Sequence, residues 1–173
     1  TDNKESKKEA AKLRKEFRSD PQTKGFLEIQ KQWKNMETAG ETGAGDISVM
    51  YSYIKMLDPT TAVREGELGL AASAAGAPDR IVKAAKKLDK GAGLGPEMRK
   101  QMVAEGASIY NNMAKEQQSL NSFYTGLATD SGFKPEDVVG SLGEIKTADV
   151  PKVEIAKDKL SERGYLSKLL SLE

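Results

Sequence analysis

The sequence predicts an all-α fold: an elongated bundle of about six helices that contains one long helix and no sheet. Apolar residues recur at helical spacing in several segments, and proline and glycine separate those segments. No run of residues reads as a strand. The longest periodic segment runs from Pro96 to about Asp130, which corresponds to a helix roughly 50 Å long. A helix of that length indicates an elongated unit.

The stretch from Asp46 to Gly76 is the most apolar part of the chain, and we expect the other helices to pack around it. Asp58-Pro59 should end a first helix and start a second one that runs to about Ala75. The second half is rich in alanine, which allows another backbone to approach closely. These features predict a buried helical hairpin. Its first helix leaves only a narrow polar stripe, formed by Ser48, Ser52 and Lys55.

Two helices are expected before this hairpin. The first covers residues 1–19 and is highly charged, with a thin apolar stripe. Asp20 and Pro21 predict the start of the second, because aspartate caps helix N-termini and proline suits the first helical position. A glycine-rich link over 38–45 leads to Asp46, which should cap the buried helix. The apolar seam of the second helix has a 3-4-3 spacing and consists of Phe26, Ile29, Trp33 and Met36.

The segments after the hairpin continue the helical pattern. Gly76 is predicted to end one helix and Pro78 to be the first residue of the next. The sequence GAGLG over 91–95 resembles a fragment of a phosphate loop, but it lacks the full glycine spacing and the GK[ST] ending, so we interpret it as a turn. The long helix should bury one face that Gln117 interrupts. That face consists of Met102, Gly106, Ile109, Met113, Leu120, Tyr124 and Leu127.

Three parts are therefore expected along the chain. Residues 1–19 form the charged N-terminal helix, and residues 20–140 form the helical bundle domain. Ser131-Gly132 should end the long helix, and a short turn should follow from Pro135. Residues 141–173 form an extended tail. A short amphipathic helix is expected near its end, on Leu166, Leu169, Leu170 and Leu172.

The composition excludes several kinds of chemistry. The chain has no cysteine and no histidine, so thiolate and imidazole metal ligands, cysteine nucleophiles and the commonest general base are all missing. The formal net charge of +1 is untypical of a strongly basic nucleic-acid domain. No apolar run approaches the roughly 20 residues that a membrane-spanning helix needs. We expect no metal, no cofactor, no small-molecule substrate and no transmembrane segment.

Carboxylates are the remaining candidates for catalysis, and the best of them flank the predicted hairpin. Asp58 is most simply explained as a helix cap. Glu65 and Glu67 are two residues apart, so they would lie on different faces of one helix, with Arg64 as a ready ion-pair partner. We therefore expect no catalytic residue and no enzymatic activity.

Residues 4–18 are the most basic segment. Its cations outnumber its anions, which is typical of an arm that contacts nucleic acid or an anionic membrane. The same residues would also form a solvated helix stabilised by ion pairs one turn apart. Aromatic residues, which stack on bases, are nearly absent from it. Weak DNA contact through residues 4–18 stays open beside the solvated helix.

The hairpin residues carry a resemblance to a known family. The sequences KMLDP (Lys55 to Pro59), VREGE (Val63 to Glu67) and APDR (Ala77 to Arg80) are similar to a segment of tailed-bacteriophage structural proteins. LRKEF over 13–17 and GFKPEDVV over 132–139 fit the same pattern more loosely, so the likeness covers about residues 13–139. Thr61-Ala62 replaces the usual Ser-Val, and Leu68 replaces the usual Phe. Both changes are compatible with a helix.

That resemblance implies a function. The segment occurs in internal virion or DNA-ejection proteins, and also in large phage proteins beside lytic modules. We therefore expect a non-enzymatic virion structural or assembly protein, or a domain of one, made in the bacterial host cytoplasm and located in the virion. Its partners would be other virion proteins or copies of itself in an oligomeric assembly. The alternatives are a helical domain of a peptidoglycan-degrading phage enzyme and a virion protein that contacts DNA through residues 4–18.

Overall fold

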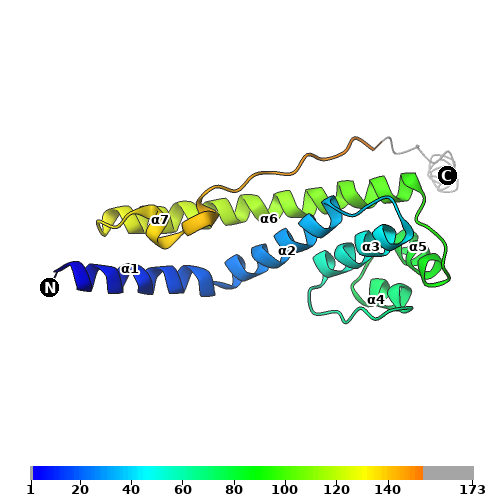
Figure 1. Ribbon diagram of the computed structural model, residues 1–173, viewed down its shortest axis with the longest axis horizontal. Coiled ribbons are helices and arrows are strands. Elements are labelled where there is room, and N and C mark those ends of the chain that lie inside the picture. Colours follow the sequence, from blue (N-terminus) through cyan, green and yellow to red (C-terminus); the bar gives the residue numbers. More distant parts are fainter. Residues whose placement is uncertain (1, 154–173) are drawn as a thin grey trace, which may run out of the picture.

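The longest helix, α6 (Pro96–Asp130), is the axis on which the molecule is built (Figure 1). The computed structural model describes residues 2–153, and within them it contains seven α-helices, one 3₁₀ helix and no strand. The predicted all-α bundle with one long helix is confirmed, including both ends of that helix. Within the same residues, none of the helices combines the length and apolar character that crossing a bilayer requires.

The elements divide into two regions that we name the stem and the head. In the stem, α1 (Asp2–Ser19) and α2 (Pro21–Glu37) run one after the other antiparallel to α6 (Figure 1). The short α7 (Pro135–Val138) and η1 (Gly140–Gly143) pack at the far end of α6. The head lies at the start of α6 and consists of α3 (Gly43–Leu57), α4 (Leu68–Ala74) and α5 (Asp79–Asp89).

The stem core follows the predicted seam of α2. All four seam residues are buried, and Trp33 stacks on Tyr110 of α6 with ring centroids 6.0 Å apart. Asp20 caps α2 as predicted: its carboxylate accepts a hydrogen bond from the Gln22 N–H at 2.8 Å. α1 joins the same core through Phe17, which is fully buried and packs on Tyr124.

The buried face of α6 includes the predicted Met102 and Gly106, but from Ala107 onward it lies one position after the predicted face. Gln117 does not interrupt it, because this side chain is fully buried at its centre. Ile109, Met113, Leu120, Tyr124 and Leu127 are only half-buried at its border. The amide nitrogen of the buried Gln117 side chain donates to Thr23 of α2 and to Asn121, whereas its Oε1 has no hydrogen-bond partner. Small and polar side chains dominate the true face, which includes Ala107, Tyr110, Ala114, Gln117, Asn121 and Ala128.

The predicted hairpin is wrong in its second helix. Residues 58–67 form a loop, and α4 begins only at Leu68. Side chains replace the helical hydrogen bonds there: the Asp58 carboxylate accepts from the Thr60 N–H at 2.9 Å, and the Lys55 ammonium donates to the carbonyl of Thr61 at 2.7 Å. Aspartate that bonds its own backbone in this way competes with helix formation. Gly66 then takes a positive φ of 75°, which also excludes a helix.

Three further predictions about the head are corrected. Thr42 caps α3 in place of Asp46, because its hydroxyl accepts from the Gly45 N–H at 3.0 Å. The solvent-facing side of α3 carries Ile47 and Tyr51, whereas Ser52 of the predicted polar stripe is buried. α5 begins at Asp79, one residue later than predicted, and Pro78 is its N-cap.

The tail is extended as predicted over residues 145–153, after the unpredicted turn η1. It runs back along α6 towards the head (Figure 1). The predicted amphipathic helix on Leu166 to Leu172 lies outside the described residues.

Candidate functional site at the junction of head and stem

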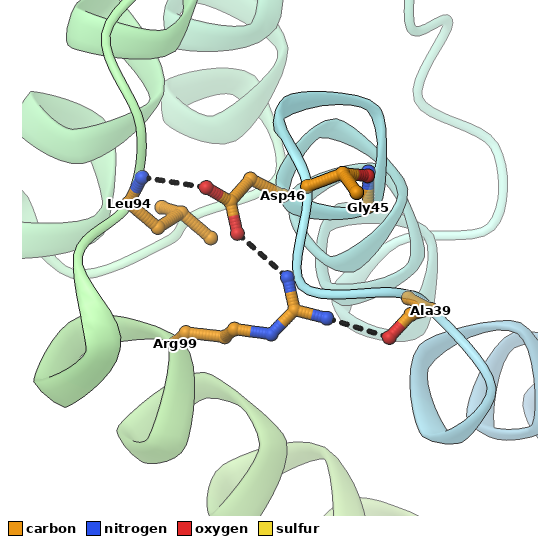
Figure 2. A network of polar contacts seen from close by, with 6 residues as sticks. Ala39, Gly45, Asp46, Leu94 and Arg99 are labelled. Carbon is orange, nitrogen blue, oxygen red and sulfur yellow. Dashed lines mark hydrogen bonds and ion pairs between the residues drawn. The ribbon is translucent and has the colours of Figure 1, made fainter.

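A polar network joins the head to the start of α6 (Figure 2). The carboxylate of Asp46, in the first turn of α3, accepts from the Leu94 N–H at 3.0 Å and from the guanidinium of Arg99 at 2.6 Å. Arg99 also donates to the carbonyl of Ala39 at 2.7 Å. Both charged side chains are only 15% exposed. This network therefore ties four segments together: α3, the link after α2, the turn before α6, and α6 itself.

Glycines make the close approach possible. A Cβ on Gly45 would lie 1.7 Å from the carbonyl oxygen of Gly40, so no other residue fits there without a backbone shift. In the turn before α6, Gly91 and Gly95 take positive φ values of 84° and 74°. The GAGLG segment thus acts as the turn between α5 and α6. Its Leu94 N–H is aimed at Asp46.

A cleft of about 790 Å³ opens beside the network. Val103 and Pro96 of α6 and Pro151 of the tail give it an apolar wall, and Glu41, Glu97 and Lys100 give it a charged rim. The two buried charges of the network already bind each other and backbone groups. The cleft can therefore bind a chain segment by apolar contact, with the rim charges selecting its polar groups.

A second cluster holds α3, α5 and α6 together in the head. The Tyr53 hydroxyl donates to the Glu105 carboxylate at 2.6 Å, and Arg80 forms an ion pair with the same carboxylate. Burial, and then this hydrogen bond to Glu105, raise the pKa of Tyr53 well above its ordinary value. The phenol therefore stays protonated and serves as a hydrogen-bond donor.

A third contact secures the short helix α4. Its N-cap residue, Glu67, makes no side-chain cap bond. Asp89, at the end of α5, supplies the cap instead: its carboxylate accepts from the N–H groups of Leu68 at 2.8 Å and Gly69 at 2.9 Å. Gly69 must be small, because a Cβ would lie 2.4 Å from the Lys86 side chain.

The three carboxylates singled out from the sequence take different positions. Asp58 binds the backbone N–H of Thr60 and the hydroxyls of Thr60 and Thr61, and these bonds lower its pKa to about 2. Glu65 and Glu67 are exposed on the loop that leads to α4. Among residues 2–153, three ion pairs form, and none of them involves Arg64.

The sequence did not indicate which residues build the junction and the two other contacts of the head. Arg99, Asp89 and Glu105 have the pattern of ordinary surface charges on helices. Only Asp46 was recognised from the sequence, and it was predicted to cap α3, whereas it binds Arg99 and Leu94. Within the described residues, no cluster of three or more acidic side chains could hold a metal ion.

Comparisons of the chain with protein-family models, with curated proteins and with solved structures found no match.

Proposed function

We propose that this chain is a non-enzymatic structural or assembly component of a tailed-bacteriophage virion, of the internal or DNA-ejection type, or a domain of such a component. The resemblance of residues 55–80 to the phage segment motivates this function. The supporting observation is that charged residues of this segment make structural contacts within the head.

Several charged residues of the segment hold the head in shape. Lys55 and Asp58 close the 58–67 loop on itself, and Arg80 pairs with Glu105 of α6. The segment's charges therefore serve to specify a shape, as expected of a building unit. Its loop then faces outwards: Arg64, Glu65 and Glu67 are exposed, and Leu70 on α4 is 68% exposed. A charged loop beside an exposed leucine is a surface suited to another protein.

Particle analysis tests this function. Purified phage particles are probed for this polypeptide by quantitative mass spectrometry before and after genome release. An internal or ejected component is present before release and depleted at least severalfold afterwards. Absence from purified particles, with the polypeptide present in the infected lysate, would overturn the proposal.

A matched pair of variants locates the contact. Glu65→Arg combined with Glu67→Arg should lower incorporation into particles, because the exposed loop would change sign. Glu116→Arg, an exposed position on α6, is the control and should incorporate normally. Thermal melting of both proteins shows whether any loss comes from unfolding.

A second candidate function is DNA contact by the same virion component, and α1 favours it. Lys4, Lys7, Lys8, Lys12 and Lys15 are all exposed, while Phe17 anchors the helix to the core. The first turns of α1 extend beyond the end of α6, where a duplex could reach them (Figure 1).

Salt dependence tests that contact. Duplex binding by the full chain should weaken with salt, and Lys4→Glu, Lys7→Glu and Lys8→Glu together should lower the slope of log affinity against log salt. The slope should fall by about 0.9 for every phosphate that the variant no longer neutralises. The same three changes at Lys83, Lys86 and Lys87, which are exposed on α5, are the control. An equal weakening by both sets would remove the special role of α1.

A further inference from the structure

An apolar groove of about 530 Å³ opens on the head between α3, the 58–67 loop and the end of α5. Its floor is formed by Leu68 and Leu88, and Val63 closes one side. Ile47 and Tyr51 line it from α3 and remain 47% and 38% exposed. These two residues are one helical turn apart, so they present a continuous apolar strip. An amphipathic helix is the element that such a strip fits.

The tail leads to this region of the molecule. Three side chains of α6 hold its backbone: Gln118 donates to the carbonyl of Ile145, Tyr110 to that of Lys146, and Asn111 exchanges two hydrogen bonds with Ala148. Ile145 is held by Gln118, whereas Lys146 and Ala148 are held by Tyr110 and Asn111, about two turns nearer the start of α6, so the tail runs towards that start. Pro151 then lines the cleft at the junction. The described chain therefore ends beside the head.

The groove lies within reach of the residues beyond position 153. Asp46 lines the cleft and Ile47 lines the groove, so the two hollows flank the same turn of α3. Residues 154–165 can span about 40 Å when extended. The whole of α3, with 15 residues, is only about 22 Å long. Residues 154–165 are therefore long enough to connect the cleft to the groove on the other side of that turn of α3.

We propose that the leucine segment 166–172 of the same chain binds this groove as an amphipathic helix. Leu166, Leu169 and Leu170 have the i, i+3, i+4 spacing that forms one apolar strip on a helix, matching the strip of Ile47 and Tyr51. A tethered segment has an effective concentration in the millimolar range. That advantage favours the chain's own segment over a free partner. Binding of the segment would hold whether or not the protein is a virion component.

Paramagnetic relaxation tests the contact directly. The chain has no cysteine, so Glu65→Cys, at the groove, carries a single nitroxide label. In the full chain with ¹⁵N-leucine, the amide signals of Leu166, Leu169 and Leu170 should lose more than half their intensity and regain it on reduction of the nitroxide. A label on Ser122→Cys, exposed on the stem, should leave them unchanged. Full intensity with the label at position 65 would overturn the proposal.

Two further experiments separate the alternatives. In a mixture of ¹⁵N-labelled protein without nitroxide and unlabelled protein with it, the leucine signals should stay intact; weakened signals would assign the groove to a second copy and overturn the proposal. Ile47→Lys should restore at least half of the missing intensity, whereas Leu70→Lys, outside the groove, should restore none. Thermal melting verifies that both variants fold. An unchanged intensity in Ile47→Lys would also overturn it.

Discussion

The head and the stem of this protein are stabilised by different means. The head contains the short helices α4 and α5 beside α3, and charged side chains from distant segments complete its helix ends and loops, as Asp89 does for α4. The stem pairs two long helices, α2 and α6, and buries polar side chains between them. Short helices are not stable alone, so each needs tertiary partners. Long helices with a repetitive apolar seam can pack in several alignments, so they need a contact that fixes the position of one helix along the other.

The buried polar group of the stem supplies that register. Gln117 of α6 donates to the Thr23 hydroxyl of α2 at 3.1 Å and to the Asn121 side chain at 3.0 Å. Asn121 in turn donates to the carbonyl of Leu142. Sliding α2 along α6 by one turn would separate Gln117 from Thr23 and leave both buried groups without that partner, which costs free energy, whereas apolar contacts would tolerate the shift. We infer that this group sets the alignment of the stem.

The largest expected effect comes from breaking the junction between the two regions. Asp46→Ala leaves the Arg99 guanidinium and the Leu94 N–H poorly paired, so the free energy of unfolding should fall by about 3 kcal/mol. Arg14→Ala is the control, because the Arg14–Asp137 pair is about half-exposed on both sides and should matter by less than about 1 kcal/mol. Urea unfolding measures both. Equal losses would mean that the junction is no more than a surface ion pair.

The next effect distinguishes the packing of the stem. Gln117→Ala removes two hydrogen bonds and opens a cavity, so stability should fall by about 2 kcal/mol. Glu116→Ala, the exposed neighbour, should change it by less than about 0.5 kcal/mol. The pair Thr23→Val and Gln117→Leu should regain most of the stability. The amides of α2 should nevertheless exchange faster in this double variant than in the unchanged protein, because no polar contact then fixes the register of α2 on α6.

A smaller effect tests the cap in the head. Asp89→Ala leaves the first amides of α4 without an acceptor, which should cost about 1 kcal/mol. Hydrogen exchange should accelerate at Leu68 and Gly69 while the stem amides keep their protection. Lys90→Ala, next in sequence and exposed, is the control. Faster exchange throughout the molecule would indicate that α4 is not a separate unit of stability.

The same difference between the regions explains what could be predicted from the sequence. Most of the stem follows from local signals: Asp20-Pro21 starts α2, Pro96 starts α6, and apolar spacing marks the buried face of α2. The face of α6 was missed because small and polar side chains, Gln117 among them, occupy it. The head depends on partners far apart in the chain, 53 residues for Asp46 and Arg99 and 21 for Asp89 and Leu68. Neither spacing nor composition records such pairings. The loop after Asp58 was missed because the side chains of Asp58 and Lys55 bind its backbone groups in place of helical hydrogen bonds.

The smallest effect concerns that loop. Hydrogen bonds from Thr60, then Thr61, lower the pKa of Asp58 from 3.8 to about 2. A depressed pKa means that the ionised carboxylate stabilises the folded loop above pH 4 and that this contribution disappears as pH falls towards 2. Carboxyl NMR should therefore give a midpoint near 2. Thr60→Val with Thr61→Val should move it towards 3.8, whereas Thr129→Val on α6 should not. An unmoved midpoint in the double variant would show that the threonine hydroxyls do not bind Asp58, and the 58–67 loop would then owe its shape to its other contacts.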